Sequence, residues 1–220
     1  MDTQALWLTL KLATVTTALL LCIAVPLSWW LAFGKARWKV AVEAVATLPL
    51  ILPPTVLGFY LLVLMGPRTA FGRFFIHLTG HPLAFSFSGL VIGSMIYSLP
   101  FAVQPVATGF SGIRTEILDA ARLLGASPLR VLFFVLLPLS RRSLFSAAVL
   151  CFAHTMGEFG VVLMIGGDIP GATRTLSIAI YDQVQDFRYT DANRTAFLLL
   201  AVTLLALIAV YSMRKQARSG

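Results

Sequence analysis

Residues 115–138 read TEILDAARLLGASPLRVLFFVLLP, a polar stretch of helical character between strongly apolar segments. Thr115 is a residue type that caps helices, and Gly125 is a typical helix stop. Glu116 and Asp119 would lie in the first turns, where the helix dipole favours carboxylates. This stretch therefore predicts a short capped helix outside the apolar phase.

The predicted helix has two distinct faces. Apolar residues follow the i, i+3, i+4, i+7 spacing of one helix face, and charged residues lie on the other. The apolar face consists of Ile117, Ala120, Ala121 and Leu124, and the charged face of Glu116, Asp119 and Arg122. Ser127 and Pro128 would then begin a second helix, as its N-cap and first residue. We expect the first helix to dock on another surface; the alternative is a loop that merely connects two spans.

The composition of the 220-residue chain is that of a polytopic membrane protein. Hydrophobic residues make up 58% and charged residues 12%, with a mean hydropathy of +0.87. Globular chains are roughly 45–50% apolar and about 25% charged. At ~20 residues per span, we predict an all-α polytopic membrane protein with about five transmembrane helices in a single domain, residues 1–220. The expected spans are 5–33, 40–65, 88–110, 143–165 and 196–213, and the expected cytoplasmic segment is 111–138.

Several function classes find no support in the sequence. No G-x-x-x-x-G-K-[ST] loop occurs, so ATP hydrolysis would need a separate chain, and we expect no cofactor. His77 and His81 have a helical ligand spacing, but Gly80 and Pro82 argue against a helix there, so we expect no metal site. The net charge of +8 is explained by basic cytoplasmic loops rather than by a nucleic-acid partner.

Basic residues cluster in three segments that share one side of the membrane if the spans alternate. They are Lys35, Arg37 and Lys39; Arg114, Arg122, Arg130, Arg141 and Arg142; and Arg214, Lys215 and Arg218. Cytoplasmic loops accumulate Lys and Arg. The predicted topology therefore has the N-terminus outside and the C-terminus in the cytoplasm.

The expected second span contains LPLILPPTVLGFY, residues 48–60. Pro53 and Pro54, together with Pro49, cannot all be accommodated in a straight helix. We predict a bend near Pro53, with the freed carbonyl groups facing neighbours or a water-lined cavity. Such a break lines a conduction path in some proteins and is an ordinary kink in others.

The expected fourth span contains CFAHTMGEFGVVLMIGG, residues 151–167. Glu158, next to Gly157, is an ionisable residue at membrane depth, where such residues mark functional sites by default. One interpretation is a proton relay with His154, four residues earlier on the same helix face. The other is that Glu158 accepts hydrogen bonds from a neighbouring helix or backbone. Arg174 follows in a mostly neutral outer segment, on the side from which a substrate arrives.

Two motifs bear a family resemblance. Asp119-Ala120-Ala121, then Gly125, then Leu136-Leu137-Pro138, resemble the E-A-A…G…I-x-L-P signature of ABC-importer permeases, with Asp119 in place of the first Glu. The resemblance implies a type I ABC-importer permease fold whose cytoplasmic helix inserts into a cleft on a separate ATPase. It implies ATPase-coupling roles for Glu116, Asp119, Ala120, Ala121, Gly125 and Pro138.

The run 48–66 further resembles molybdate-importing permeases, and G-E-F-G at 157–160 resembles oxyanion-importing permeases. This implies import of a tetrahedral oxyanion, molybdate or tungstate, with sulfate or thiosulfate as the alternative. Because ATP powers such importers, we favour the hydrogen-bonded interpretation of Glu158 over the proton relay. The implied partners are two ABC ATPase subunits, a second copy of the chain, an external oxyanion-binding protein and the lipid of a prokaryotic plasma membrane. The candidates for the translocation path or gate are Pro53, Pro54, Gly157, Glu158 and Arg174.

An intramembrane enzyme is the alternative from a different class. His154 with Ser143 or Ser146 is the nucleophile-and-base material of the fourth span. These residues are roughly two to three helical turns apart, which excludes direct contact within one helix. We therefore expect no catalytic residue.

Overall fold

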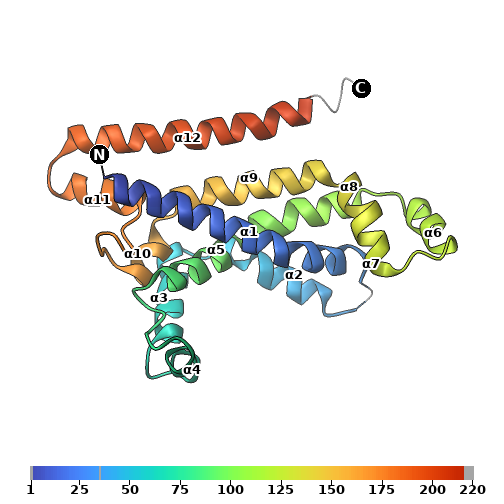
Figure 1. Ribbon diagram of the computed structural model, residues 1–220, viewed down its shortest axis with the longest axis horizontal. Helices are drawn as coiled ribbons and strands as arrows, with labels where there is room; N and C mark the ends of the chain where they lie inside the picture. The colour runs from blue at the N-terminus through green and yellow to red at the C-terminus, as the bar shows by residue number, and fades with distance from the viewer. Residues whose placement is uncertain (1, 35, 216–220) are drawn as a thin grey trace.

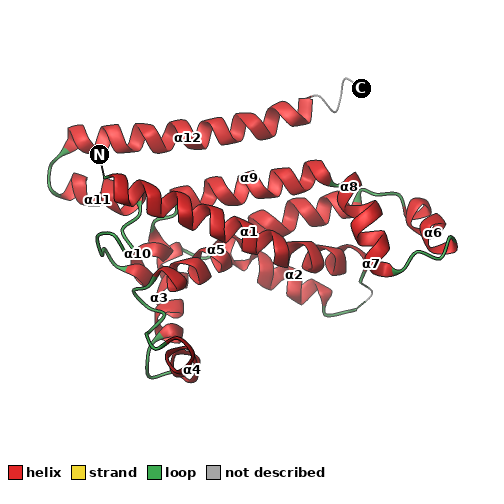
Figure 2. Cartoon of the chain, viewed as in Figure 1, coloured by secondary structure: helices red, strands yellow, loops and turns green. Residues whose placement is uncertain are grey.

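The computed structural model describes residues 2–34 and 36–215, and every regular element in that part of the chain is a helix (Figure 2). The elements are α1 (Thr3–Phe33), α2 (Lys39–Thr47), η1 (Leu48–Leu50), α3 (Pro54–Met65), α4 (Ala70–Thr79), α5 (Phe87–Ser111), α6 (Thr115–Leu123), α7 (Pro128–Val131), η2 (Leu132–Leu136), α8 (Leu137–Leu139), α9 (Arg141–Gly157), α10 (Gly160–Gly166), α11 (Leu176–Gln185) and α12 (Tyr189–Lys215). Of the two η elements, η1 is a 3-10 helix and η2 a π-helical stretch. The predicted all-α class is confirmed. Lys35 and Arg218, two of the basic residues used to predict the topology, lie outside the described residues.

Three helices are individually long and apolar enough to cross a membrane: α1, α5 and the Tyr189–Ile208 part of α12. Two bent pairs are further candidates. Lys39–Leu50 and Pro54–Met65 meet at 110°, and Pro128–Leu139 and Arg141–Gly157 meet at 76°. The described chain therefore has three helices that could each span a membrane, or up to five candidate spans if each bent pair is one span, compatible with the expected number of about five.

Helices α1, α5 and α9 pack against one another and form the centre of the molecule (Figure 1). Helix α12 lies against α9 and α11, and α10 packs on α3 and α5. Figure 1 places the N-terminus and α11 at one end of the molecule, and α6, α7 and α8 at the opposite end. Which end faces the cytoplasm stays a prediction from the charges.

Small residues and interhelical hydrogen bonds hold the central helices together. A Cβ atom on Gly109 of α5 would lie only 2.5 Å from Cβ of Ser143 on α9, so the two helices can approach this closely only at glycine. The Ser28 hydroxyl of α1 donates to the Val103 carbonyl of α5 at 3.0 Å. Both kinds of contact favour helix association in lipid, where burial of apolar surface gives little driving force.

The predicted bend in the second span is confirmed. Element η1 ends at Leu50, and α3 begins with Pro54, at a position where a helix needs no N–H group. The expected fourth span, 143–165, is also interrupted, which the sequence analysis did not predict. Helix α9 ends at Gly157, and Glu158 is extended, with φ −66° and ψ 132°. The glycines that flank this break have low helix propensity, and the hydroxyl of Ser177 on α11 donates to the freed Glu158 carbonyl.

Candidate functional site

A cavity of about 500 Å³ lies where the breaks of the second and fourth expected spans meet. Pro54, Gly157 and Glu158, predicted separately as path or gate residues, come together in the fold around this cavity. Pro53 is the exposed residue just before α3, and Arg174 does not line the cavity. We call this space the break cavity; it is lined by Pro54, Thr55, Tyr97, Ala153, His154, Gly157, Glu158, Phe159 and Gly160.

The short helices that follow the two breaks approach each other through glycines. A Cβ atom on Gly160 would lie 2.7 Å from Cβ of Pro54, and one on Gly58 would lie 2.7 Å from Cβ of Met164. Real Cβ atoms are not found this close, so the contact between α3 and α10 needs both glycines. This packing fixes the position of one break relative to the other.

The structure corrects one interpretation of Glu158. Because Glu158 is extended rather than helical, it does not share a helix face with His154, as the proton relay required. The favoured hydrogen-bonded interpretation stays a prediction for the side chain, which is buried beside Ser94 of α5. Glu158 is 3% exposed, and neither carboxylate oxygen has a hydrogen-bond partner among the described residues. Only its backbone is bonded, through its N–H to the Thr155 carbonyl and through its own carbonyl to Ser177.

His154 lines the break cavity and is held by residues of α5. Its Nδ1 atom lies 2.9 Å from the Ser98 hydroxyl of α5, and that hydroxyl lies 3.1 Å from the hydroxyl of Thr155. The imidazole ring stacks on Phe101 at 4.1 Å between centroids and contacts Tyr97 at 4.8 Å. The ring is therefore fixed in both position and orientation.

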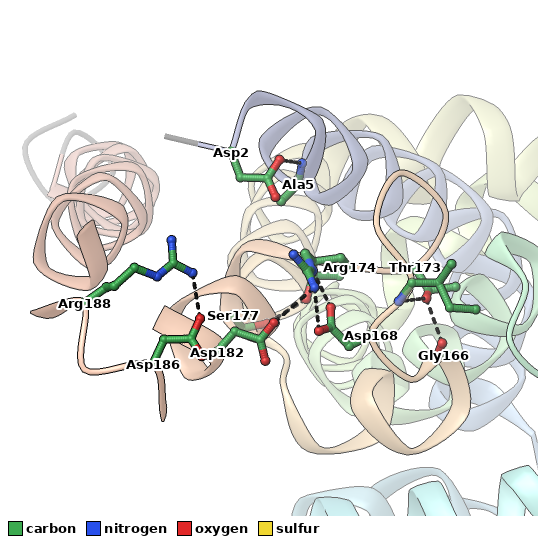
Figure 3. A network of polar contacts seen from close by, with 12 residues as sticks. Asp2, Ala5, Gly166, Asp168, Thr173, Arg174, Ser177, Asp182, Asp186 and Arg188 are labelled. Atoms are coloured by element: carbon green, nitrogen blue, oxygen red, sulfur yellow. Dashed lines mark hydrogen bonds and ion pairs between the residues drawn. The ribbon is translucent and has the colours of Figure 1, made fainter. Parts of the chain in front are cut away.

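Arg174 forms an ion-pair network with two carboxylates near the N-terminus (Figure 3). Its Nε atom donates to Asp168 Oδ1, and its Nη2 atom donates to Asp168 Oδ2 at 2.7 Å. Nη2 also lies 3.2 Å from Asp182 Oδ2 on α11. The expected mostly neutral setting of Arg174 is therefore wrong. Its charge is compensated, and it joins the loop after α10 to α11 as a bidentate anchor.

This network shifts the pKa values of its members. The hydrogen bond from Arg174 holds the pKa of Asp168 below its usual value and raises the pKa of Arg174 itself. The pKa of Asp182 is raised to about 6, chiefly because its carboxyl shares a hydrogen bond with the Asp168 carboxyl, and further because of burial and the Asp168 charge. The two neighbouring carboxyl groups therefore titrate in different pH ranges.

Helix α6, at the opposite end of the molecule, has no side-chain capping bond at its N-terminus and a glycine capping motif at its C-terminus. Its N-cap is Arg114 and not Thr115, because Thr115 is already helical, and Arg114 makes no side-chain capping bond. The predicted stop at Gly125 is confirmed: φ is +81°, and its N–H donates to the Arg122 carbonyl at 2.9 Å. The next N–H, of Ala126, donates to the Ala121 carbonyl at 3.1 Å, which completes a Schellman motif.

The predicted apolar face of α6 is divided between its own chain and solvent. Leu118 is 2% exposed and belongs to a core cluster of residues from α5, α6, α7, η2 and α9, against which Ala121 also packs. Ala120 is exposed, and Leu123 and Leu124 are each 89% exposed. Of the predicted docking face, Ala121 packs on its own chain and Leu124 is uncovered, whereas the buried Leu118 does not belong to that predicted face.

The charged candidates of this segment form surface ion pairs. Arg114 Nε lies 3.4 Å from Glu116 Oε2, and Arg122 Nη1 lies 3.1 Å from Asp119 Oδ1. Exposed pairs of this kind typically contribute ~0–1 kcal/mol to stability. Pro138 lies in α8, at the elbow before α9, and lines a hollow of about 330 Å³. The other residues around this hollow are Leu139, Arg141 and Arg142.

A comparison with known protein families shows to which family the chain belongs. Residues 24–217 match the family described as "Binding-protein-dependent transport system inner membrane component". The chain belongs to this family. It is therefore a multi-pass inner-membrane transport subunit and not an enzyme, and the intramembrane-enzyme alternative is not favoured.

Relatives match along almost the whole chain. The molybdenum transport system permease protein of Azotobacter vinelandii is 49% identical over 214 residues, which cover 97% of this chain and 95% of that protein. The corresponding protein of Escherichia coli (strain K12) is 33% identical over 93% of this chain and 90% of its own length. A putative molybdenum transport system permease protein of Bacillus subtilis (strain 168) is 32% identical over 92% of this chain and 89% of its own.

Solved structures share the fold. A chain from an inward-facing crystal form of the MetNI methionine ABC transporter superposes with a TM-score of 0.74 at 19% identity, covering 98% of this chain and 95% of that chain. A chain from a bacterial alginate ABC importer superposes with a TM-score of 0.77 at 14% identity, covering 97% of this chain and 79% of that chain. The expected type I ABC-importer permease fold is confirmed by these neighbours.

Two features of the site were missed by the sequence analysis. The acidic partners of Arg174 were not predicted, although Asp168 and Asp182 flank Arg174 in the sequence. The residues that hold His154 come from α5, more than fifty positions away in the chain. The ion pairs of Arg174 had a local signal, namely the charges of neighbouring residues. The contacts of His154 had no signal in the residue spacing.

Proposed function

We propose that this chain is the permease subunit of an ATP-driven importer of molybdate. The observation that carries the proposal is the 49% identity, along nearly its full length, to the molybdenum permease of Azotobacter vinelandii. Tungstate has the same tetrahedral shape and charge and is included in the proposal. No specific observation favours the sulfate or thiosulfate alternative, because the relatives described above are molybdenum permeases.

In this proposal the break cavity is part of the translocation path. Two bent spans meet there, and non-helical backbone at membrane depth is tolerated where it is buried in protein or lines a cavity. Pro54, Gly157 and Glu158 line this part of the path, and Pro53 supports the bend. A second copy of the chain closes the path, and membrane lipid covers the apolar outer faces of the spans.

Two separate ATPase subunits drive transport through α6 and the elbow at Pro138. Uncovered leucines on a short helix that is tied to the core by Leu118 suit insertion into a partner's cleft. Under the predicted topology α6 lies in the cytoplasm with the C-terminus, and the N-terminus lies outside. An external oxyanion-binding protein delivers the substrate to the end that carries the N-terminus and α11.

The test is reconstituted transport. The chain is co-expressed with the ATPase and binding protein encoded beside it, purified and placed in vesicles, and uptake of labelled molybdate is measured with and without ATP. We expect uptake that needs both ATP and the binding protein, is blocked by excess tungstate and is insensitive to equal sulfate. Uptake of sulfate in preference to molybdate would overturn the substrate, and uptake without ATP would overturn the class of transporter.

The topology has its own test. Single cysteines introduced at Asp2 and at Gly80 are probed in intact cells with a reagent that does not cross the membrane. We expect both to be labelled, and a cysteine at Leu124 to be protected. Protection of residue 2 with labelling at residue 80 would mean an odd number of crossings between them, so that either α1 or the bent pair of α2 and α3 does not cross the membrane.

A further inference from the structure

The imidazole of His154 has one ring nitrogen that no described residue uses. Nδ1 is engaged by the Ser98 hydroxyl at 2.9 Å. Nε2 has no hydrogen-bond partner in the described part of the chain, and it is not among the unpartnered polar atoms that are sealed from solvent. Since His154 lines the break cavity, Nε2 is the ring atom available to a molecule inside it.

The hydrogen-bond chain behind the ring decides which nitrogen carries the proton. Ser98 has a single hydroxyl hydrogen and two neighbours, Nδ1 and the hydroxyl of Thr155. If Ser98 donated to Thr155, the Thr155 hydroxyl hydrogen would be buried, at 2% exposure, without an acceptor among the bonds of the described chain. Buried donors without acceptors are costly and rare. Donation therefore runs from Thr155 to Ser98 to Nδ1, which leaves the ring proton on Nε2.

The ring that presents this N–H is held rigidly. Phe101 stacks on it with centroids 4.1 Å apart, and Tyr97 contacts it at 4.8 Å. Both aromatic residues belong to α5, as does Ser98, so one helix fixes both the plane of the ring and its tautomer. A donor fixed in this way loses little freedom when it meets an acceptor.

The cavity presents this donor without exposing carboxylate oxygens. Both side-chain oxygens of Glu158 are sealed from solvent, so an anion in the cavity does not meet them directly. Thr55, an exposed residue at the start of α3, adds a hydroxyl to the lining. A path must bind its substrate well enough to admit it and weakly enough to release it, and neutral donors meet both conditions for an anion.

We infer that His154 is a recognition residue of the path, whose Nε2–H donates a hydrogen bond to an oxygen of the tetrahedral oxyanion in the break cavity. Ser98 is the positioning residue that holds the tautomer. The inference rests on the proposed import of molybdate and adds to it a named contact between substrate and permease.

Transport by matched variants is the first test. His154→Phe keeps an aromatic ring between Tyr97 and Phe101 but has no donor, and His154→Gln returns an N–H near the position of Nε2. We expect the maximal rate of ATP-dependent molybdate uptake to fall about 10-fold or more in His154→Phe, as for loss of one hydrogen bond to a charged group, and to recover partly in His154→Gln. The concentration at half-maximal uptake should stay constant, because the binding protein captures the substrate first. The control is His77→Phe on α4, outside the cavity.

Nitrogen NMR supplies a readout that a purely structural role would not move. The chain has three histidines, so His77→Phe with His81→Phe leaves His154 as the one labelled imidazole. In the assembled transporter we expect the Nε2–H tautomer and a shift of the Nε2 signal on addition of molybdate. Ser98→Ala should remove the preference for the Nε2–H tautomer of His154 while leaving the imidazole ring in place.

The outcomes separate the two proposals. If the wild type does not import molybdate, the proposed function fails and the contact fails with it. If the wild type imports molybdate but His154→Phe does so at the same rate, or the Nε2 signal does not respond to molybdate, the contact alone is overturned. An unfolded His154→Phe protein still leaves the NMR response of the wild-type ring to decide.

Discussion

Around the break cavity, helices touch through their backbones, whereas α6 is held to its own chain by one fully buried leucine. Gly58 and Gly160 bring α3 and α10 into direct contact, and the cavity walls come from α3, α5, α9, α10 and the residues between them. Helix α6 buries Leu118 and leaves Leu123 and Leu124 in solvent. The first region is built within a single chain, and the second leaves two leucines that its own chain does not cover. The proposed function needs this difference, because a wall of the path must keep its shape while a joint must engage a separate subunit.

Leu124→Glu should have the largest effect, because it places a charge where the partner's cleft is expected. We expect the affinity for the ATPase to fall about 30-fold or more, as for loss of an interface hot spot of ~2 kcal/mol or more. The thermal stability of the permease alone should not change, since Leu124 is 89% exposed. Binding of the purified ATPase to the permease in nanodiscs measures this. The control is Leu78→Glu, an exposed leucine of α4 at the other end of the molecule; equal binding by both variants would mean that α6 is not the joint.

Replacing Asp by Asn in two different ion pairs should sharpen the contrast between the half-buried Arg174 network and the surface of α6. Asp168→Asn removes the carboxylate that binds Arg174 in bidentate fashion, and we expect it to lower the free energy of unfolding by about 1.5–3 kcal/mol. Asp119→Asn removes an exposed partner of Arg122, and ~0.2–1 kcal/mol is expected. Denaturant unfolding of both variants in the same detergent measures the two losses. Equal losses would contradict the assignment of Arg174 as an anchor.

Gly160→Ala tests the backbone contact that joins the two breaks. The added Cβ would lie 2.7 Å from Cβ of Pro54, and overpacking of this kind costs about 1–3 kcal/mol. Gly157→Ala is the matched control for stability, because a Cβ at Gly157 meets no atom within 4 Å. Melting temperatures of the two variants give the comparison. A loss in Gly157→Ala as large as in Gly160→Ala would show that the α3–α10 contact does not set the effect.

Local sequence signals predicted most of the fold. Proline chemistry predicted the bend at Pro53, and Gly125 predicted the end of α6, because both depend on the backbone of a few neighbouring residues. The break at Glu158 was missed because the residues around it read as one apolar helix. Its cause is partly distant, because the Ser177 hydroxyl that donates to the freed Glu158 carbonyl belongs to α11.

Packing between distant segments accounts for the other errors at the site. The apolar period of α6 predicted which residues share a face, but not that Ala121 would turn toward its own core while Leu124 would not. Glu158 was expected to find hydrogen-bond donors, and the donor from another helix that the structure shows, the Ser177 hydroxyl, bonds its backbone carbonyl. Neither outcome depends on neighbours within a few residues, so spacing alone contained no signal for it.

The smallest effect we predict is a pH dependence confined to the Arg174 network, outside the spans. Because the folded pKa of Asp182 is raised to about 6, from 3.8, its contribution to stability is fully present below pH 3.8 and is lost as the pH rises through about 6. Asp168 has the opposite sign, since its pKa is lowered, but its contribution changes only below its ordinary pKa. Between pH 5 and 7.5 the first effect dominates, so the loop between α10 and α11 should open more readily at pH 7.5. Hydrogen exchange of Thr173 to Leu176, corrected for the intrinsic pH dependence, measures this opening. Asp182→Asn should abolish the difference. Greater protection of the loop at pH 7.5 than at pH 5 would contradict the sign worked out here and would mean that Arg174 holds Asp182 as a charged partner throughout.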